Sequence, residues 1–477
     1  SSRLSFYKLN FLNHAKIKFV FIICLSSFIS ACGFQSYKAK PIKPNEIIDA
    51  LETRSTESES FNQFLVSQNY SKPTPIQEWG LDELTYSALF FHPELNVARA
   101  QWRAAQSAEI TAAQRPEIGI NGERQRHSKA EDVSPWTYSM GIDIGIITAG
   151  KIQPRIEQAR GLSEAARIEI AQMAWQIRSR LAKSLFDYQY SSQLVKVLED
   201  EVRLRTAIVD MLEKRMEAGM ASSIELNVAR LALQKSQQSL QTELGAIPGL
   251  EAILANNAGL PLSSFKKLAV NQAFQPNSEI PVDLMQYQAL LNRLDVRASL
   301  SRFEAAEAKL RLEIAKQYPD FTLSPSRISE QGDKIWNLSF SSLLTLVNRN
   351  RGLIAEAVAQ RELQIAQFEA LQAKVIASLN QSKANYLAAS GVKEKAEKVL
   401  SNQENRTLQT EAQFNAGFAD RLELTTVRLE NVTAAQNVLQ ATYRMQLAKL
   451  ELEDAIQRPL NNFMMPKDLE NKFRNTQ

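Results

Sequence analysis

Two segments of the chain alternate apolar and polar residues with the period of two that is typical of a half-covered β-strand. In the first, the apolar positions are Trp136, Tyr138, Met140, Ile142, Ile144 and Ile146; in the second they are Trp336, Leu338 and Phe340. Each is preceded by a strand-like piece, at 118–122 or 321–324. A polar, turn-rich segment, at 124–135 or 325–334, lies between that piece and the alternating segment. The alternation fits a hairpin of a soluble sheet or a membrane-barrel hairpin with a watery interior.

Helical patterns fill most of the remaining chain. Segments 80–115 and 284–317 are predicted helices, each closed by a proline, Pro116 or Pro319. Two much longer helices follow, at about 154–216 and 352–414, each spanning about 95 Å at 1.5 Å per residue. The apolar seam of the first advances in alternating steps of three and four, which predicts left-handed supercoiling against neighbouring helices. Neither helix contains an apolar run of about 18 residues, so we expect neither to cross a bilayer.

Each long helix ends at a glycine, Gly219 or Gly417, as expected for a left-handed cap at a helix hairpin. A return helix then begins at a Ser or Asp with a glutamate, Glu225 or Glu423, three residues later, which is a capping-box pattern. The return helices should reach about residues 257 and 457. Pro248, followed by a glycine, should kink or interrupt the first of them.

The same order of features occurs twice. The segment 215–226 around Gly219 is echoed by 413–424 around Gly417, with the glutamates and Arg230 and Arg428 in matching places. The pairs Trp136 and Trp336, Pro116 and Pro319, and Pro261 and Pro459 recur at nearly the same spacing. A tandem duplication of about 200 residues accounts for this agreement.

The N-terminal 31 residues have the pattern of a secretory signal peptide. Four basic residues precede a short apolar run at 19–29, which is followed by Ser30, Ala31 and Cys32. These residues resemble the bacterial lipobox, which implies cleavage before Cys32 and a covalent lipid on its thiol; an ordinary secreted protein with an incidental cysteine is the alternative. Gly33, rather than Asp, after the cysteine implies the outer membrane. The net charge of +4 lies wholly in this signal.

Composition excludes several classes of function. The 52 acidic and 56 basic residues leave a charge-balanced mature chain, which removes support for nucleic-acid binding. His92 and His127 are isolated and read as solvent-exposed structural residues, so we expect no metal site. No phosphate-binding loop or serine nucleophile elbow occurs. We therefore expect a non-enzymatic protein without a cofactor other than the lipid on Cys32.

The lipobox, the duplication, the strand hairpins and the long helical hairpins together resemble the TolC-like outer-membrane efflux family. Further matching pieces are 93–95, 259–261 and 348–357, the last resembling the strand-to-helix junction of lipoprotein members. The resemblance covers about residues 80–460. It implies a mainly α fold with a small β part, in which a homotrimer builds a 12-stranded β-barrel continued by an α-barrel of helical hairpins.

This resemblance also implies a function and partners. The chain would be the passive exit duct of a tripartite efflux system, anchored in the outer membrane, extending into the periplasm and meeting an adaptor protein and an inner-membrane pump. Glu225 and Glu423 match positions that line the periplasmic entrance in the family, although a capping role alone also explains them. Trp136 and Trp336 become candidate membrane-interface aromatics, with packing inside the protein as the alternative.

Two other functions stay open at this point: a periplasmic adaptor lipoprotein, which has one hairpin flanked by β-domains, and a structural coiled-coil lipoprotein without a pore. We divide the chain into a signal peptide (1–31), an N-terminal lipid-anchored segment (32–79), a first efflux repeat (80–261), an equatorial connector (262–283), a second repeat (284–460) and a C-terminal tail (461–477).

Overall fold

The computed structural model of the chain describes residues 35–128, 134–275, 280, 287–344, 348–461, 463–466 and 469. The expected signal peptide and Cys32 therefore lie outside the described residues. The chain forms two units, 1–50 and 51–477. In the first, α2 (Pro44–Glu52) begins after residues without regular structure and carries the ion pair between Lys43 and Glu46. All that follows concerns the second unit.

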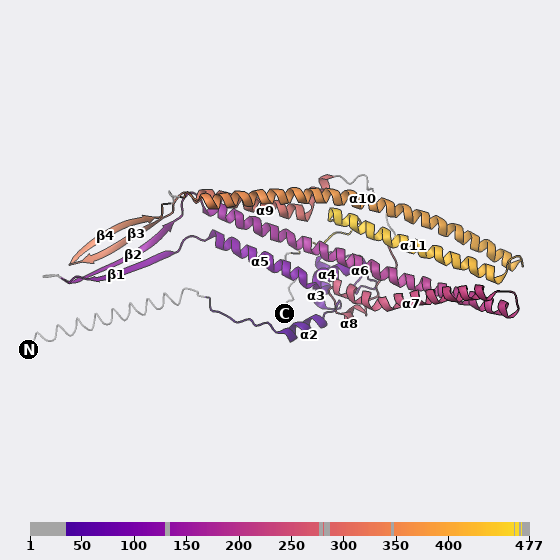
Figure 1. Cartoon of the computed structure of the whole chain (residues 1–477). Helices are drawn as coiled ribbons and strands as arrows, with labels where there is room; N and C mark the ends of the chain where they lie inside the picture. The colour runs from indigo at the N-terminus through magenta and orange to yellow at the C-terminus, as the bar shows by residue number, and fades with distance from the viewer. Residues whose placement is uncertain are drawn as a thin grey trace, which may run out of the picture. The chain divides into compact units, whose positions relative to one another are not determined.

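Two very long helices organise this unit (Figure 1). They are α6 (Ile152–Glu217) and α10 (Arg351–Asn415), and each returns through a shorter partner, α7 (Ser223–Asn257) or α11 (Arg421–Ile456). The other helices are α3 (Glu59–Ser67), α4 (Leu81–Phe91), α5 (Pro93–Ala113), α8 (Leu262–Phe265), the 3-10 helix η2 (Tyr287–Asn292) and α9 (Leu294–Ala315). The two long helices match their predicted bounds to within two residues, because the apolar seam marks them continuously.

The helices form one layer with α6 in the middle. Near the hairpin turns the order is α7, α6, α11 and α10, and nearer the sheet it is α5, α6, α9 and α10. The predicted seam of α6 is largely buried, including Ile170, Ile177, Leu181, Val195 and Leu212. By contrast α10 buries few residues and exposes large apolar side chains such as Leu387 and Leu408. Helix α10 is thus one edge of the layer, and the other edge is α7 near the hairpin turns and α5 nearer the sheet.

The four strands form one antiparallel sheet in the order β1-β2-β3-β4. They are β1 (Ile118–Arg126), β2 (Trp136–Ile146), β3 (Phe321–Glu330) and β4 (Asp333–Ser342). The first hairpin pairs Ile118 with Ile144, and the second pairs Phe321 with Ser342. Strand β2 joins the hairpins by pairing with β3 in a constant register. Among the described residues β1 and β4 each have one strand neighbour, and their outer edges are unpaired there.

Three local predictions were wrong. The segments 124–135 and 325–334 are not turns throughout, because β1 continues to Arg126, β3 runs through Pro325 to Glu330 and β4 starts at Asp333. Their serines and charged residues are compatible with strands since both sheet faces are open to solvent. Segment 80–115 is two helices, because Pro93 starts a new one with His92 as its N-cap.

Pro248 does not interrupt α7, which is continuous across it. The helix loses one backbone hydrogen bond there. Ile247 and Leu250 on either side pack against the core, and Leu254 is fully buried one turn later. This packing holds the helix together across the proline.

The largest core lies where α3, α4, the middle of α6, the end of α7 and α8 meet. Phe61 and Phe64 of α3 pack on Phe90, Phe91 and Trp79. The predicted N-terminal segment and connector also meet directly, because the Trp79 backbone exchanges hydrogen bonds with Ala269 and Asn271 at 2.9 and 3.0 Å. Two regions for which the sequence predicted no structure thus close over the middle of α6.

Candidate functional site: the sheet faces and the hairpin turns

The sheet leaves its apolar face uncovered, unlike a soluble sheet, which packs that face against a core. Cross-strand partners share a face, so the pairs Ile120 with Ile142 and Leu323 with Phe340 lie on the same side. Exposed fractions on this face are high, for example 81% at Ile120, 70% at Met140 and 79% at Phe340. Along β2 the small and polar residues between them are less exposed than the apolar ones. A soluble hairpin would cover the apolar face, so the alternation favours a strand that faces lipid.

The opposite face carries a polar network across three strands. The Asp143 carboxylate of β2 accepts hydrogen bonds from the Asn121 amide of β1 at 2.9 Å and from the Ser324 hydroxyl of β3 at 2.5 Å. Gly141 lies beside them, and a Cβ there would come within 2.9 Å of the Ser326 side chain. Small residues therefore let the strands pack closely while the face stays hydrophilic.

Trp136 and Trp336 both lie on the apolar face, near the hairpin ends of their strands. The Arg124 guanidinium stacks 3.7 Å from the Trp136 ring centre, and that of Arg327 lies 5.4 Å from the Trp336 ring centre. Trp336 is 78% exposed, so it is not a buried packing residue within one chain. Both positions are those that an interfacial aromatic residue would take, and that role stays a prediction.

The two helix hairpins turn at the predicted glycines. Gly219 has φ +71° and Gly417 φ +79°, in the left-handed region that favours glycine. After α6 the Met220 amide donates to the Arg215 carbonyl at 2.7 Å, and after α10 the Phe418 amide donates to the Gln413 carbonyl at 2.8 Å. Each turn is thus a Schellman motif, which ends the long helix and reverses the chain.

Side chains cap both return helices, but the glutamates do not complete the capping boxes. The Ser222 hydroxyl accepts from the Glu225 amide at 3.2 Å, and the Asp420 carboxylate accepts from the Glu423 amide at 2.8 Å. In the described part of the chain neither the Glu225 nor the Glu423 carboxylate makes a hydrogen bond or an ion pair, and both residues are exposed. Each carboxylate lies in a first helical turn, where the helix dipole favours negative charge.

An ion pair joins the two hairpin ends, which also share an apolar cluster that includes Leu212 and Leu422. Arg215, in the last turn of α6, pairs with Asp420 at the start of α11 at 2.9 Å. The hydrogen bond from the Glu423 amide and, after it, the Arg215 contact lower the pKa of Asp420. Glu225 and Glu423 are therefore carried by adjacent turns.

Each helix hairpin also contains an ion pair between its own two helices, at equivalent positions. Arg230 reaches back to Glu213 at 2.5 Å in the first, and Arg428 to Glu411 at 2.8 Å in the second. The sequence had matched the two arginines without indicating their partners. Each pair ties a return helix to its long helix about one turn before the long helix ends.

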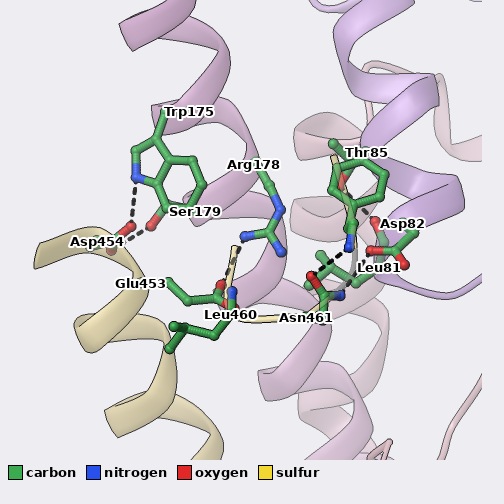
Figure 2. Close-up of polar contacts among 11 residues, drawn as sticks. Leu81, Asp82, Thr85, Trp175, Arg178, Ser179, Glu453, Asp454, Leu460 and Asn461 are labelled. Atoms are coloured by element: carbon green, nitrogen blue, oxygen red, sulfur yellow. Dashed lines mark hydrogen bonds and ion pairs between the residues drawn. The ribbon is translucent and has the colours of Figure 1, made fainter. Parts of the chain in front are cut away.

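A buried polar cluster that the sequence did not reveal joins α6 to α11 (Figure 2). Arg178 of α6 is fully buried and donates to the Glu453 carboxylate at 2.9 Å. Trp175 and Ser179 donate to the two carboxylate oxygens of Asp454, at 2.9 and 2.7 Å. Burial raises the pKa of Asp454, and the two donors only partly offset that. These residues lie far apart in the sequence, so no motif could have identified them.

The first of the two histidines differs from its prediction. His92 is buried rather than solvent-exposed, because it sits between α4 and α5 and caps α5 through Nδ1. His127 is half-buried and its Nε2 lies 2.8 Å from the Thr137 hydroxyl. Among the described residues no group of three or more His, Cys, Asp or Glu side chains could hold a metal ion. Within the same residues, every helix is too short or too polar to span a membrane.

A known protein family matches most of the chain, and individual curated relatives match a little under half of it. The profile of the family described as outer membrane efflux protein matches twice, at residues 84–247 and 285–456. The cobalt-zinc-cadmium resistance protein CzcC of Cupriavidus metallidurans is 23% identical over 47% of this chain and 54% of its own. The solvent efflux pump outer membrane protein SrpC of Pseudomonas putida is 27% identical over 43% of this chain and 45% of its own. The chain thus spans about half the length of these curated relatives.

Solved structures share the fold over nearly their whole length. The outer-membrane channel OprN superposes with a TM-score of 0.67 at 17% identity, covering 90% of this chain and 98% of its own. The outer membrane protein VceC of Vibrio cholerae gives a TM-score of 0.65 at 18% identity, covering 80% of this chain and 97% of its own.

Proposed function

Because the chain belongs to the outer membrane efflux protein family, we propose that it is the outer-membrane exit duct of a tripartite efflux system. The observation that carries this proposal is the sheet with an uncovered apolar face and a polar network on the other face. That arrangement suits a strand between lipid and a water-filled lumen. Conduction would be passive, with energy supplied by an inner-membrane pump through a periplasmic adaptor.

The duct would be a homotrimer. Open sheet edges are not tolerated in lipid, and β1 and β4 each have a free edge. Pairing β1 of one chain with β4 of the next in a ring of three would close a 12-stranded barrel. The helical layer of the same unit has one edge at α10 and the other at α7 and α5. One threefold arrangement would cover these edges together with those of the sheet and continue the barrel as a helical tube.

Two findings support an ancestral duplication. The family matches the chain twice, and each half has the same order of helix, strand hairpin, long helix and return helix. Two helical hairpins per chain also distinguish it from an adaptor, for which one hairpin was expected. The exposed apolar sheet face argues against a coiled-coil lipoprotein without a pore.

Electrophysiology combined with mass measurement tests the duct. Purified protein in detergent should have the mass of three chains and should produce discrete conductance steps in a planar bilayer. A monomer that needs no detergent after removal of its acyl chain would contradict the proposal.

The trimer interface can be tested with cysteines at both helical edges. Ile224 on α7 is 75% exposed and Leu408 on α10 is 64% exposed, and both lie near the hairpin turns. An Ile224→Cys, Leu408→Cys variant treated with a bis-maleimide should give dimer and trimer bands on a denaturing gel. Each single variant is the matched control and should stay monomeric, and a ladder from a single variant would show a different contact.

Lipid attachment at Cys32 is a separate part of the proposal, supported by the lipobox-like residues before it. Labelled palmitate should enter the wild-type protein and not a Cys32→Ser variant. Incorporation into both would contradict attachment at this residue.

A further inference from the structure

The charged residues of the sheet are sorted completely between its two faces. Four cationic side chains lie in the strands, on the apolar face: Arg124, Arg126, Arg327 and Lys334. The four acidic ones, Glu123, Asp143, Glu330 and Asp333, all lie on the polar face. The register fixes this assignment, because Arg124 pairs with Tyr138 and Arg327 with Trp336, whereas Glu123 pairs with Ser139.

The cations occupy only the hairpin end of the apolar face. Arg126 pairs with Trp136 and Lys334 with Ser329, in the last rows before the chain turns. Toward the helices the same face is uncharged, with Ile118, Ile144 and Phe340 among its residues. Strand β2 covers about 25 Å along a barrel axis when it is tilted as barrel strands are, which is the height of an apolar membrane band. The cations thus mark one boundary of that band.

All three guanidinium groups lie over aromatic rings, Arg126 at 5.6 Å from the Trp136 ring centre. Arg124 stacks on Trp136 at 3.7 Å and lies 5.6 Å from the Tyr138 ring centre, while Arg327 lies over Trp336. Stacking uses the flat face of a guanidinium and leaves its N–H edge free to donate. Among the described residues none of the four cations has a carboxylate within ion-pair distance, and Arg124, Arg126, Arg327 and Lys334 are all exposed. Their charge has no counterpart within the described part of the chain.

We propose that these four cations, which we call the cationic belt, bind the phosphate groups of a phosphorylated glycolipid in the outer leaflet. The inference rests on the proposed membrane barrel, in which the hairpin ends point away from the periplasmic helices and so reach the outer leaflet. Each stacked arginine presents two N–H groups that can engage a phosphate bidentately. The trimer would carry three such belts, one for each four-stranded sheet. The acids on the other face cannot compete, because they face the lumen.

Lipid binding measured on the intact protein tests the cationic belt. Detergent-solubilised trimer is titrated with lipid A, a diphosphorylated diglucosamine lipid, and bound lipid is counted by native mass spectrometry. We expect wild type to prefer lipid A over its dephosphorylated form, with affinity falling as salt is raised. A quadruple Arg124→Gln, Arg126→Gln, Arg327→Gln, Lys334→Gln variant should lose at least about fivefold in affinity, the factor expected for even one cation at a lipid surface.

Three controls make the outcome decisive. A Glu123→Gln, Glu330→Gln variant alters the charge of the opposite face and should keep wild-type affinity. An Arg124→Lys, Arg126→Lys, Arg327→Lys variant keeps the charge and should retain most of the phosphate preference. Inorganic phosphate at the same concentration should not displace the lipid, whose acyl chains also bind the apolar band.

Two results would overturn the proposal: equal affinity of wild type for phosphorylated and dephosphorylated lipid, or equal binding of phosphatidylglycerol at matched charge. The first needs no variant and therefore does not depend on mutant folding. Conductance in a zwitterionic bilayer separates this inference from the duct itself, because the quadruple variant should still conduct there. A wild-type protein that binds lipid A but forms neither trimer nor conductance would instead contradict the proposed function.

Discussion

The Arg178 guanidinium of α6 lies 2.9 Å from the Glu453 carboxylate of α11, with both side chains buried. A second Glu453 oxygen accepts from the Leu460 amide at 2.9 Å. Two other guanidinium nitrogens of Arg178, Nε and Nη2, have no hydrogen-bond partner among the described residues. The pair links the two helical hairpins at the level of the main core, and a buried charge left without its partner is costly.

Replacement of Arg178 by methionine should destabilise the protein strongly, because it leaves Glu453 buried and uncompensated. We expect a loss of about 3–5 kcal/mol in the free energy of unfolding, measured by urea denaturation in detergent. A further Glu453→Gln change should restore part of the loss. Arg203→Met breaks the exposed pair with Asp200 and should cost less than about 1 kcal/mol. Similar losses for Arg178→Met and Arg203→Met would contradict the importance of the buried pair.

Glu313 joins α9 to the start of α10 and is the most strongly shifted carboxyl of this junction. Its side chain is 1% exposed and pairs with Lys309 at 2.6 Å and Lys316 at 2.9 Å. The Asn350 amide donates to it at 3.0 Å. Burial alone would raise the pKa of Glu313, but these contacts outweigh it and hold the pKa at about 2, below the ordinary 4.5.

The stabilisation from Glu313 should depend on pH in a defined direction. The folded state binds the proton less tightly than the unfolded state, so the stabilisation is complete above pH 4.5 and is lost as the pH falls toward 2. Glu313→Gln should therefore lower the free energy of unfolding at pH 7 by roughly 2–3 kcal/mol. Thermal unfolding at several pH values should show this difference shrinking below pH 4.5. A constant difference across that range would contradict the linkage.

Sequence periodicity predicted the long elements well because the same apolar spacing recurs many times along each of them. The seam of α6 fixed both its ends to within two residues, and alternation placed β2 at 136–146. Polar β3 and β4 were assigned too short, since Pro325 and the serines around it resemble a turn when the strand is read alone. Only the cross-strand register shows that these serines share a face with Asp143.

The functional surfaces were predictable in part. The glycines at the turns were found because a left-handed residue is required wherever a long helix reverses. The partner of Arg178 lies more than half the chain away, in the other hairpin, and an arginine inside a helix is ordinarily exposed. The sorting of charge between the sheet faces needs the register of all four strands, which alternation within single strands does not supply.

Two glycines with the same backbone conformation should differ in their tolerance of alanine. At Gly219 (φ +71°) no atom of the described residues lies within 4 Å of an added Cβ, so Gly219→Ala should cost only the backbone strain of about 1–2 kcal/mol. At Gly259 (φ +75°) a Cβ would lie 2.9 Å from the Phe91 Cβ and 3.0 Å from the His92 nitrogen.

Gly259→Ala should therefore add an overpacking cost of about 1–3 kcal/mol to that strain. Thermal melts of both variants give the comparison. Gly249→Ala, inside α7 with open space around it, should be slightly stabilising and serves as control. A larger loss of stability for Gly219→Ala than for Gly259→Ala would contradict the role of the close approach at Phe91.

Neutralising the carboxylates beside the hairpin turns should change ion selectivity, provided that the turns surround the periplasmic entrance. Glu225 and Glu423 are exposed, and their carboxylates are unpaired in the described part of the chain. Only their backbone amides take part in capping the helices, so a Glu225→Gln, Glu423→Gln variant should fold normally. Three chains would present six carboxylates, and their loss should reduce cation preference, measured as reversal potential in a planar bilayer under a salt gradient. The matched variant Glu362→Gln, Glu369→Gln removes equal charge from α10 far from the turns and should leave the reversal potential nearer to wild type. Unchanged selectivity in the first variant would leave these glutamates with no role beyond the first turn of their helices.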